Sequence, residues 1–197
     1  MHNKPYAAAA EQNRGDILKV LAIEFMHANS VLEIGSGTGQ HAIYFAEHLP
    51  HLTWQSSDKK EMLTGINLWI DEAGLTNAPR AIALDVTDKW PNEKFDAAYG
   101  ANIAHIMHSD EIEALFSGLG KALKPDAKFC LYGPFNMDGH YTSESNREFD
   151  LWLKQRDPQS FLRDKSYLDK LARLNQLEPA DYHSMPSNNF ILCWQKS

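Results

Sequence analysis

The chain alternates short runs of aliphatic and aromatic residues with longer stretches in which apolar residues recur at helical spacing. The short runs predict strands over residues 31–34, 52–57, 81–84, 95–99 and 128–132, and two more on either side of a turn at residues 186–189. The longer stretches predict helices over residues 16–28, 43–49 and 59–73, from Ser109 onwards, from Ser145 to about Pro158, and over residues 168–174. Strands that alternate with helices predict an α/β fold with a mostly parallel sheet, to which the last two strands add an antiparallel hairpin.

The length of the chain suits one domain. At 197 residues it is long enough for a complete α/β core and too short for two domains of ordinary size, so residues 1–197 are expected to fold as a single unit. Residues 1–15 form a leader that we interpret as a lid over the site, the alternative being a frayed terminus. Residues 133–164 form an unusually polar insertion, interpreted as a wall of the substrate site, the alternative being ordinary surface.

Composition and charge narrow the range of partners. The formal net charge is −7 and no run of Lys and Arg occurs, which argues against a nucleic-acid partner. No apolar run approaches the ~18 residues of a membrane span, and the first residues do not resemble a secretory leader, so a cytoplasmic protein without a membrane partner is expected. Cys130 and Cys193 lie in apolar runs and are expected to be reduced core residues. Small molecules are the favoured partners, and the oligomeric state stays open.

The segment from Val31 to His41 joins a predicted strand to a predicted helix through Gly35, Gly37 and Gly39. Glycine lets the backbone turn sharply and approach a ligand closely, and the start of a helix presents free backbone N–H groups. A strand, a glycine turn and a helix in this order predict a nucleotide-cofactor site.

Glu33, at the end of the first strand, distinguishes between cofactors. Its carboxylate would repel the pyrophosphate of NAD and attract a ligand that carries an ammonium and a sulfonium group. The string that resembles a dinucleotide-binding motif, Gly37 to Ala42, also begins two residues after Gly35. In a dinucleotide-binding fold the motif begins at the first glycine after the strand. These features predict S-adenosylmethionine as the cofactor.

Other polar positions near predicted strand ends are candidate cofactor contacts. Asp58 lies about 20 residues beyond Gly37, a spacing that suits a carboxylate accepting hydrogen bonds from ribose hydroxyls, and it could also cap the following helix. Asn102, after the fourth strand, is the candidate ligand for the methionine portion. The predicted cofactor contacts also include Ser36, Gln40 and Lys59.

The string from Glu33 to Gly39 resembles motif I, E-x-G-x-G-x-G, of the class I S-adenosylmethionine-dependent methyltransferases. The resemblance implies their Rossmann-like fold, with a seven-stranded, mostly parallel sheet and a C-terminal antiparallel hairpin. It also implies that Asp85 accepts a hydrogen bond from the adenine amino group and that Val86 packs on the adenine ring.

Over nearly its whole length the chain resembles the methyltransferase-like protein 26 family. The residues that carry this likeness, besides motif I, are Glu11, Asn13, Leu84-Asp85-Val86, Trp90-Pro91, Asn102, His105-Ile106, Tyr132-Gly133-Pro134-Phe135, Asp138-Gly139, Thr142 to Asn146, Phe149-Asp150, Arg156-Asp157-Pro158, Arg163-Asp164, Met185-Pro186 and Asn188-Asn189. Gln12 stands where the family pattern has an arginine, and Asp16 stands where it has a proline. The likeness implies S-adenosylmethionine binding and names no substrate.

Methyl transfer requires mainly that a nucleophile be held in line with the methyl group in a dry site. His105 is the candidate general base, its alternative being a loop histidine bonded to backbone, and Tyr132 is a second candidate catalytic residue. No cysteine or carboxylate stands at metal-ligand spacing from His105, His108 or His140, so no metal site is predicted. Asn102 also lacks the following Pro-Pro-Tyr of methyltransferases that act on flipped bases.

The candidate acceptor site combines segments that are distant in the sequence. Besides His105 and Tyr132, its predicted substrate contacts are Tyr6, Asn13, Phe135 and Asn146. The predicted function is methyl transfer from S-adenosylmethionine to a small molecule. The alternative is a protein that binds the cofactor without turnover and acts as an interaction or regulatory module, and a dehydrogenase is the third choice.

Overall fold

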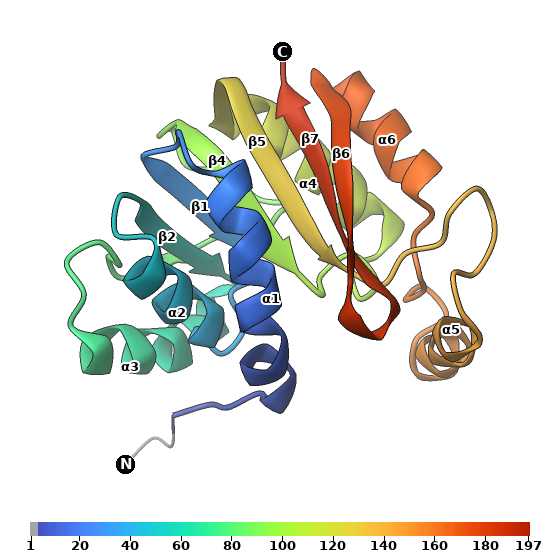
Figure 1. Ribbon diagram of the computed structural model, residues 1–197, viewed down its shortest axis with the longest axis horizontal. Coiled ribbons are helices and arrows are strands. Elements are labelled where there is room, and N and C mark those ends of the chain that lie inside the picture. The colour runs from blue at the N-terminus through green and yellow to red at the C-terminus, as the bar shows by residue number, and fades with distance from the viewer. Residues whose placement is uncertain (1–3) are drawn as a thin grey trace.

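The computed structural model describes residues 4–197 and contains a seven-stranded sheet in the order β3-β2-β1-β4-β5-β7-β6 (Figure 1). The strands are β1 (Ser30–Ile34), β2 (Thr53–Asp58), β3 (Ile82–Ala83), β4 (Phe95–Ala101), β5 (Leu123–Gly133), β6 (Leu177–Met185) and β7 (Asn189–Lys196). The strands from β3 to β5 pair in parallel, whereas β7 is antiparallel to both β5 and β6. The predicted Rossmann-like sheet with a C-terminal antiparallel hairpin is confirmed.

Helices cover both faces of this sheet. They are α1 (Ala8–Glu24), α2 (Gln40–His48), α3 (Leu63–Ala73), α4 (Ser109–Ala122), α5 (Glu144–Arg156) and α6 (Lys165–Leu174), with short 3-10 turns η1 (Lys60–Met62) and η2 (Pro186–Asn188). Leu21 of α1 and Phe45 of α2 belong to the core on one face, and Leu115 of α4 and Leu168 of α6 belong to the core on the other. Because the central strands are covered on both sides, their sequences are nearly continuous apolar runs.

Several helix boundaries differ from the predicted ones. α1 begins at Ala8 rather than at Asp16, because the alanines that precede Asp16 are strong helix formers. The helix ends at Glu24. The predicted lid, residues 1–15, is therefore mostly helix, and its residues 1–3 lie outside the described part of the chain. α5 begins earlier than predicted because Ser143, not Ser145, caps it by accepting the backbone N–H of Asn146 at 3.1 Å.

The short segment before α1 lies against α3. The indole N–H of Trp69 donates to the carbonyl of Pro5 at 2.8 Å, and the Lys4 ammonium pairs with Glu72 at 2.6 Å. The backbone N–H of Ala7 donates to Oε1 of Gln40, at the start of α2, at 2.6 Å. These contacts fix the beginning of α1 above the glycine turn. Within residues 4–197, no helix has the length and hydrophobicity of a membrane span.

Candidate functional site

Three adjoining cavities lie at the carboxyl ends of the central strands, where open α/β sheets bind ligands. One of about 440 Å³ lies between the ends of β1, β2 and β4, and one of about 200 Å³ lies between the glycine turn and the start of α1. The third, of about 550 Å³, is bounded by α1, β5, α5 and the β6–β7 turn. Among residues 4–197, Asn102 is the one that lines all three cavities, so they lie next to one another at this residue.

At the first and third glycines of the turn a side chain would clash with its neighbours, whereas a Cβ on Gly37 would meet nothing within 4 Å. Gly35 has a φ of +69°, and a Cβ on it would lie 2.6 Å from a methyl group of Ile103. Gly39 has a φ of +89°, and a Cβ there would lie 3.1 Å from the backbone of Ile66 in α3. The first glycine therefore keeps the cavity open, and the third lets α2 pack closely on α3 rather than on the strand.

Glu33 is buried beneath this turn and lines the 200 Å³ cavity together with Ser36. Its Oε2 accepts hydrogen bonds from the hydroxyl of Ser36 at 2.9 Å and from the indole N–H of Trp54 at 3.1 Å. Burial raises the pKa of Glu33 to about 7, and these two hydrogen bonds oppose the rise. The sequence did not predict this contact of Trp54, because a tryptophan in a strand is expected to be an ordinary core residue.

Asp58 closes the other side of the turn. Its Oδ2 accepts the backbone N–H of Gly37 at 2.7 Å, and its Oδ1 accepts the N–H of Lys59, also at 2.7 Å. The carboxylate thus joins the end of β2 to the glycine turn and does not cap α3, which begins only after η1. Both Asp58 and Lys59 line the 440 Å³ cavity.

The other predicted cofactor contacts divide into two groups. Val86 lines the 440 Å³ cavity. The side chain of Asp85 is instead held by Thr87, whose N–H and hydroxyl donate to Oδ1 at 3.0 and 2.8 Å, and it is not part of the lining. Gln40 is likewise not a lining residue, because its side chain accepts from Ala7. The structure therefore brings most, but not all, of the predicted cofactor residues to the cavities.

The loop after β4 forms the boundary between the cavities. Asn102 has a φ of +57°, a conformation that asparagine tolerates better than most residues, and its N–H donates to the carbonyl of Tyr132 at 2.8 Å. Beyond it, Ile103 and Met107 line the 440 Å³ cavity, whereas His105 lines the 550 Å³ cavity. A single loop therefore shapes two cavities.

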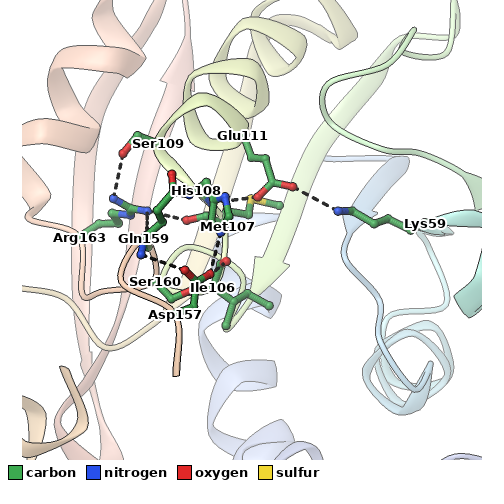
Figure 2. Close-up of polar contacts among 10 residues, drawn as sticks. All are labelled: Lys59, Ile106, Met107, His108, Ser109, Glu111, Asp157, Gln159, Ser160 and Arg163. Carbon is green, nitrogen blue, oxygen red and sulfur yellow. Dashed lines mark hydrogen bonds and ion pairs between the residues drawn. The ribbon is translucent and has the colours of Figure 1, made fainter. Parts of the chain in front are cut away.

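The insertion holds this loop in place through Arg163, which is 1% exposed. Figure 2 shows its guanidinium reaching the loop, where it donates to the carbonyl of Met107 and to the hydroxyl of Ser109, the latter at 3.3 Å. It also donates to the carbonyl of Ala104 at 3.2 Å. Alongside, Nε2 of His108 pairs with Asp157 at 2.7 Å. Arg163 therefore holds the loop after β4 in place and does not line the cavity as a substrate contact.

The 550 Å³ cavity collects most of the predicted acceptor residues. Its lining comprises Ala9, Gln12, Asn13, Asp16, Asn102, His105, Tyr132, Pro134, Ser145, Asn146, Phe149, Met185, Pro186, Ser187 and Asn189. Two predicted residues lie elsewhere. Tyr6 is 63% exposed, because the segment before α1 turns towards α3, and Phe135 is fully buried in the core beside β5.

His105 and Tyr132 differ in their surroundings. Burial, together with the positive charge of Arg163, lowers the pKa of His105 to about 4, so the imidazole is neutral at physiological pH. Its ring meets the ring of Phe149 edge to face, with centroids 5.3 Å apart. Burial raises the pKa of Tyr132, and the nearby Asn13 amide opposes that rise. Asn13 is itself held by Nε2 of His41 at 2.7 Å, a contact that the sequence reasoning did not find.

The lining of the 550 Å³ cavity carries little charge. Asp16 is the only carboxylate in its lining, and neither lysine nor arginine is part of the lining. The nearby cations are already paired on their own helices: Arg14 with Glu11, Lys19 with Asp16, and Arg147 with Glu144. The lining is otherwise made of amides, hydroxyls and aromatic rings, which suits an uncharged polar ligand.

Comparison with known proteins gives a family and a fold. The family model described as "Protein of unknown function (DUF938)" matches residues 4–196. Among solved structures, the mitomycin 7-O-methyltransferase MmcR aligns with a TM-score of 0.84 at 16% identity, over 96% of this chain and 55% of that one. The S-adenosylmethionine-dependent methyltransferase SibL, in its apo form, aligns with a TM-score of 0.80 at 18% identity, over 96% of this chain and 56% of that one. The SAH-bound CalO1, a methyltransferase in calicheamicin biosynthesis, aligns with a TM-score of 0.74 at 15% identity, over 96% of this chain and 54% of that one.

These likenesses concern the fold. At such identities they establish that the chain shares the architecture of methyltransferases of this class, and the chain spans about half the length of each.

Proposed function

We propose a function for this chain, which belongs to the DUF938 family of proteins of unknown function: it binds S-adenosylmethionine and transfers the methyl group to a small, uncharged acceptor. The observation that supports the proposal most strongly is the set of three neighbouring cavities that share Asn102: one of a size for a nucleoside, a small one for an amino acid and a third for an acceptor. The fold shared with methyltransferases supports it. The finer resemblance to the methyltransferase-like protein 26 family belongs to the same proposal.

The residues present fit S-adenosylmethionine better than NAD. The 440 Å³ cavity offers Leu84, Val86 and Ile103 to an adenine ring and the Asp58 carboxylate to a ribose. The 200 Å³ cavity offers the buried Glu33 to a cationic methionine portion. A pyrophosphate placed between Glu33 and Asp58 would face two carboxylates and no cation in the turn, which disfavours a dehydrogenase. When bound, S-adenosylmethionine supplies an activated methyl group.

The acceptor cavity supports a role for His105 as a hydrogen-bond acceptor. Its neutral imidazole can accept the proton of a hydroxyl or amine and so hold the nucleophile in place. A base with a pKa of about 4 is weak, yet the attacking atom becomes strongly acidic as the new bond forms, so a late proton transfer to His105 is sufficient. Tyr132, beside Asn13, would orient the same acceptor. An anionic acceptor would find Asp16 and no cation in the lining.

Transfer of a labelled methyl group tests this function. The protein is incubated with methyl-labelled S-adenosylmethionine and a fractionated pool of small metabolites, and we expect label in the fraction of uncharged, polar compounds. His105→Phe should bind the cofactor normally and lose transfer, whereas His140→Ala, an exposed histidine of the insertion, should behave as wild type. Normal cofactor binding with no transfer to any fraction would favour the alternative, a regulatory module without turnover.

Removal of the Asp58 carboxylate should weaken cofactor binding. Asp58→Ala loses both the acceptor for the ribose hydroxyls and the bond to the N–H of Gly37, so we expect a loss of ~1–3 kcal/mol in binding free energy. Asp71→Ala, which removes an exposed carboxylate of α3 paired only with Arg80, is the matched control. Calorimetry with S-adenosylmethionine measures both variants, and equal affinities would remove Asp58 from the site.

Cofactor affinity should depend on pH through Glu33. Because burial raises the pKa of this carboxyl from 4.5 to about 7, the group is largely protonated in mildly acidic solution, and a cationic ligand favours its ionised form. Affinity should therefore rise about tenfold between about pH 5.5 and 7 and level off above. Glu33→Gln, which cannot ionise, should bind more weakly and with no such slope. Titrations at several pH values measure this, and an unchanged slope in the variant would contradict the assignment.

A further inference from the structure

A cluster of metal-ligating side chains lies away from the three cavities, between α1 and the antiparallel end of the sheet. One ligand atom from each of Glu24, His183 and Cys193 lies within 4.8 Å of the others. Cys130 is outside this group of three, but its Sγ lies 3.5 Å from the Sγ of Cys193. The side chain of Glu24 is 6% exposed and both cysteines are buried, whereas the side chain of His183 is 30% exposed, so three of the four donors are largely withdrawn from water.

The fold assembles the cluster from four elements. Cys130 of β5 stands directly opposite Cys193 of β7 in the antiparallel register. His183 reaches the same face from β6, just past an irregularity in the β6–β7 pairing between Pro179 and Tyr182. Irregularities of this kind often aim a side chain at a site. Glu24, in the last turn of α1, completes the set from above the sheet.

We propose that Glu24, His183, Cys193 and Cys130 bind a zinc ion. Thiolate, imidazole and carboxylate are the three ligand types that zinc takes in proteins, in tetrahedral groups of four. With bonds of ~2.0–2.3 Å, the ligand atoms of such a site lie about 3.3–3.8 Å apart. The sulfur separation of 3.5 Å already has this value. The 2.8 Å between Oε1 of Glu24 and Nε2 of His183 must open, and the Cys130 thiol, which is outside the group whose ligand atoms lie within 4.8 Å of one another, must turn towards the other three ligands.

Charge supports the same assignment. Lys128 pairs with Oε2 of Glu24 at 2.7 Å, which leaves Oε1, the atom that faces His183, as the ligand. Two thiolates and one carboxylate carry three negative charges, and zinc with the Lys128 ammonium carries three positive ones, so the filled site is neutral. Binding is an exchange in which two S–H bonds break and their two protons leave to solvent, while the proton between Nε2 of His183 and Glu24 moves to Nδ1 of the same ring. Two Zn–S bonds, one Zn–N bond and one Zn–O bond form.

The position of the cluster gives the metal a structural role. Tyr132 follows Cys130 by two residues along β5, and Met185 follows His183 by two along β6, so each cavity residue lies next to a ligand on the same face of the sheet. Asn13 and Glu24 are carried by the same helix. Zinc would therefore join α1 to the strands directly beneath the acceptor cavity, whatever reaction that cavity carries out.

Zinc titration of the full chain tests the site. The protein, freed of metal with a chelator under reducing conditions, should take up one equivalent of zinc and release two protons per zinc into a weakly buffered solution. Cobalt should give the strong visible absorption of a tetrahedral site together with a thiolate-to-cobalt band. Cys193→Ser and Glu24→Gln should lose at least tenfold in zinc affinity, whereas His140→Ala should not change it.

Binding by scattered surface histidines is the outcome that would overturn the proposal. It would appear as zinc uptake that Cys193→Ser leaves unchanged, or as a cobalt spectrum without a thiolate band. Absence of saturable uptake by the wild-type chain would overturn it equally. Because Glu24→Gln keeps the size of the side chain, its loss of affinity with unchanged far-ultraviolet circular dichroism separates loss of the site from loss of the fold.

Discussion

Gly35→Ala should lower the affinity for S-adenosylmethionine by about 100-fold, or ~2.7 kcal/mol, while the protein stays folded. The new Cβ would lie 2.6 Å from a methyl group of Ile103, a branched side chain with little freedom to turn away. Gly35 and Ile103 line the same 440 Å³ cavity, so relief of the clash must move one of them into it. Overpacking of this kind costs typically ~1–3 kcal/mol, and the added methyl group also occupies space needed by the ligand.

Gly74→Ala is the matched control for this variant. Gly74 ends α3 with a φ of +60°, close to the +69° of Gly35, and a Cβ on it would meet nothing within 4 Å. Both variants therefore carry the same cost of about 1–2 kcal/mol for a side chain in the left-handed region, but only one disturbs the cavity. Equal cofactor affinities in calorimetry would contradict the site assigned to the glycine turn.

Arg163→Met should lower the free energy of unfolding by ~3 kcal/mol and reduce cofactor affinity as well. The substitution leaves the buried carbonyl of Ala104 and the partly buried carbonyl of Met107 without this donor, and the cost exceeds what methionine regains by packing. The loop from residue 103 to 108 then loses its support, and that loop lines two of the cavities. Urea unfolding and calorimetry measure the two effects.

Arg156→Met gives the comparison within the same insertion. Arg156 is exposed and stacks on the ring of Trp152, 4.7 Å from its centroid, so its loss should change stability by no more than about 0.5 kcal/mol. If the two variants unfold at the same urea concentration and bind the cofactor equally, Arg163 does not hold the loop.

The fold and the glycine turn could be predicted because local sequence determines them. Short apolar runs that alternate with stretches of helical spacing predict a parallel α/β sheet. Glu33 followed by three spaced glycines predicts the turn after the first strand. The strand ends then bring Asp58, Val86 and Asn102 together, because parallel strands finish at one edge of the sheet.

The features that were missed depend on contacts between distant segments. Tyr6 and Phe135 were assigned to the acceptor site by their place in the chain, but one points to solvent and the other into the core. The polar residue type of Arg163 suggests surface, and only the packing of the insertion on the loop shows that it is buried. Glu24 and Cys193 are far apart in the sequence, so no spacing motif announces the cluster between α1 and the sheet.

Calorimetry of the intact protein with S-adenosylmethionine, S-adenosylhomocysteine and NADH, each at neutral pH, tests the central claim most directly. We expect saturable binding of one equivalent of each of the first two ligands and no heat from NADH beyond dilution. Binding of NADH with none of S-adenosylmethionine, or binding of none of the three, would contradict the assignment of the cavities around Asn102.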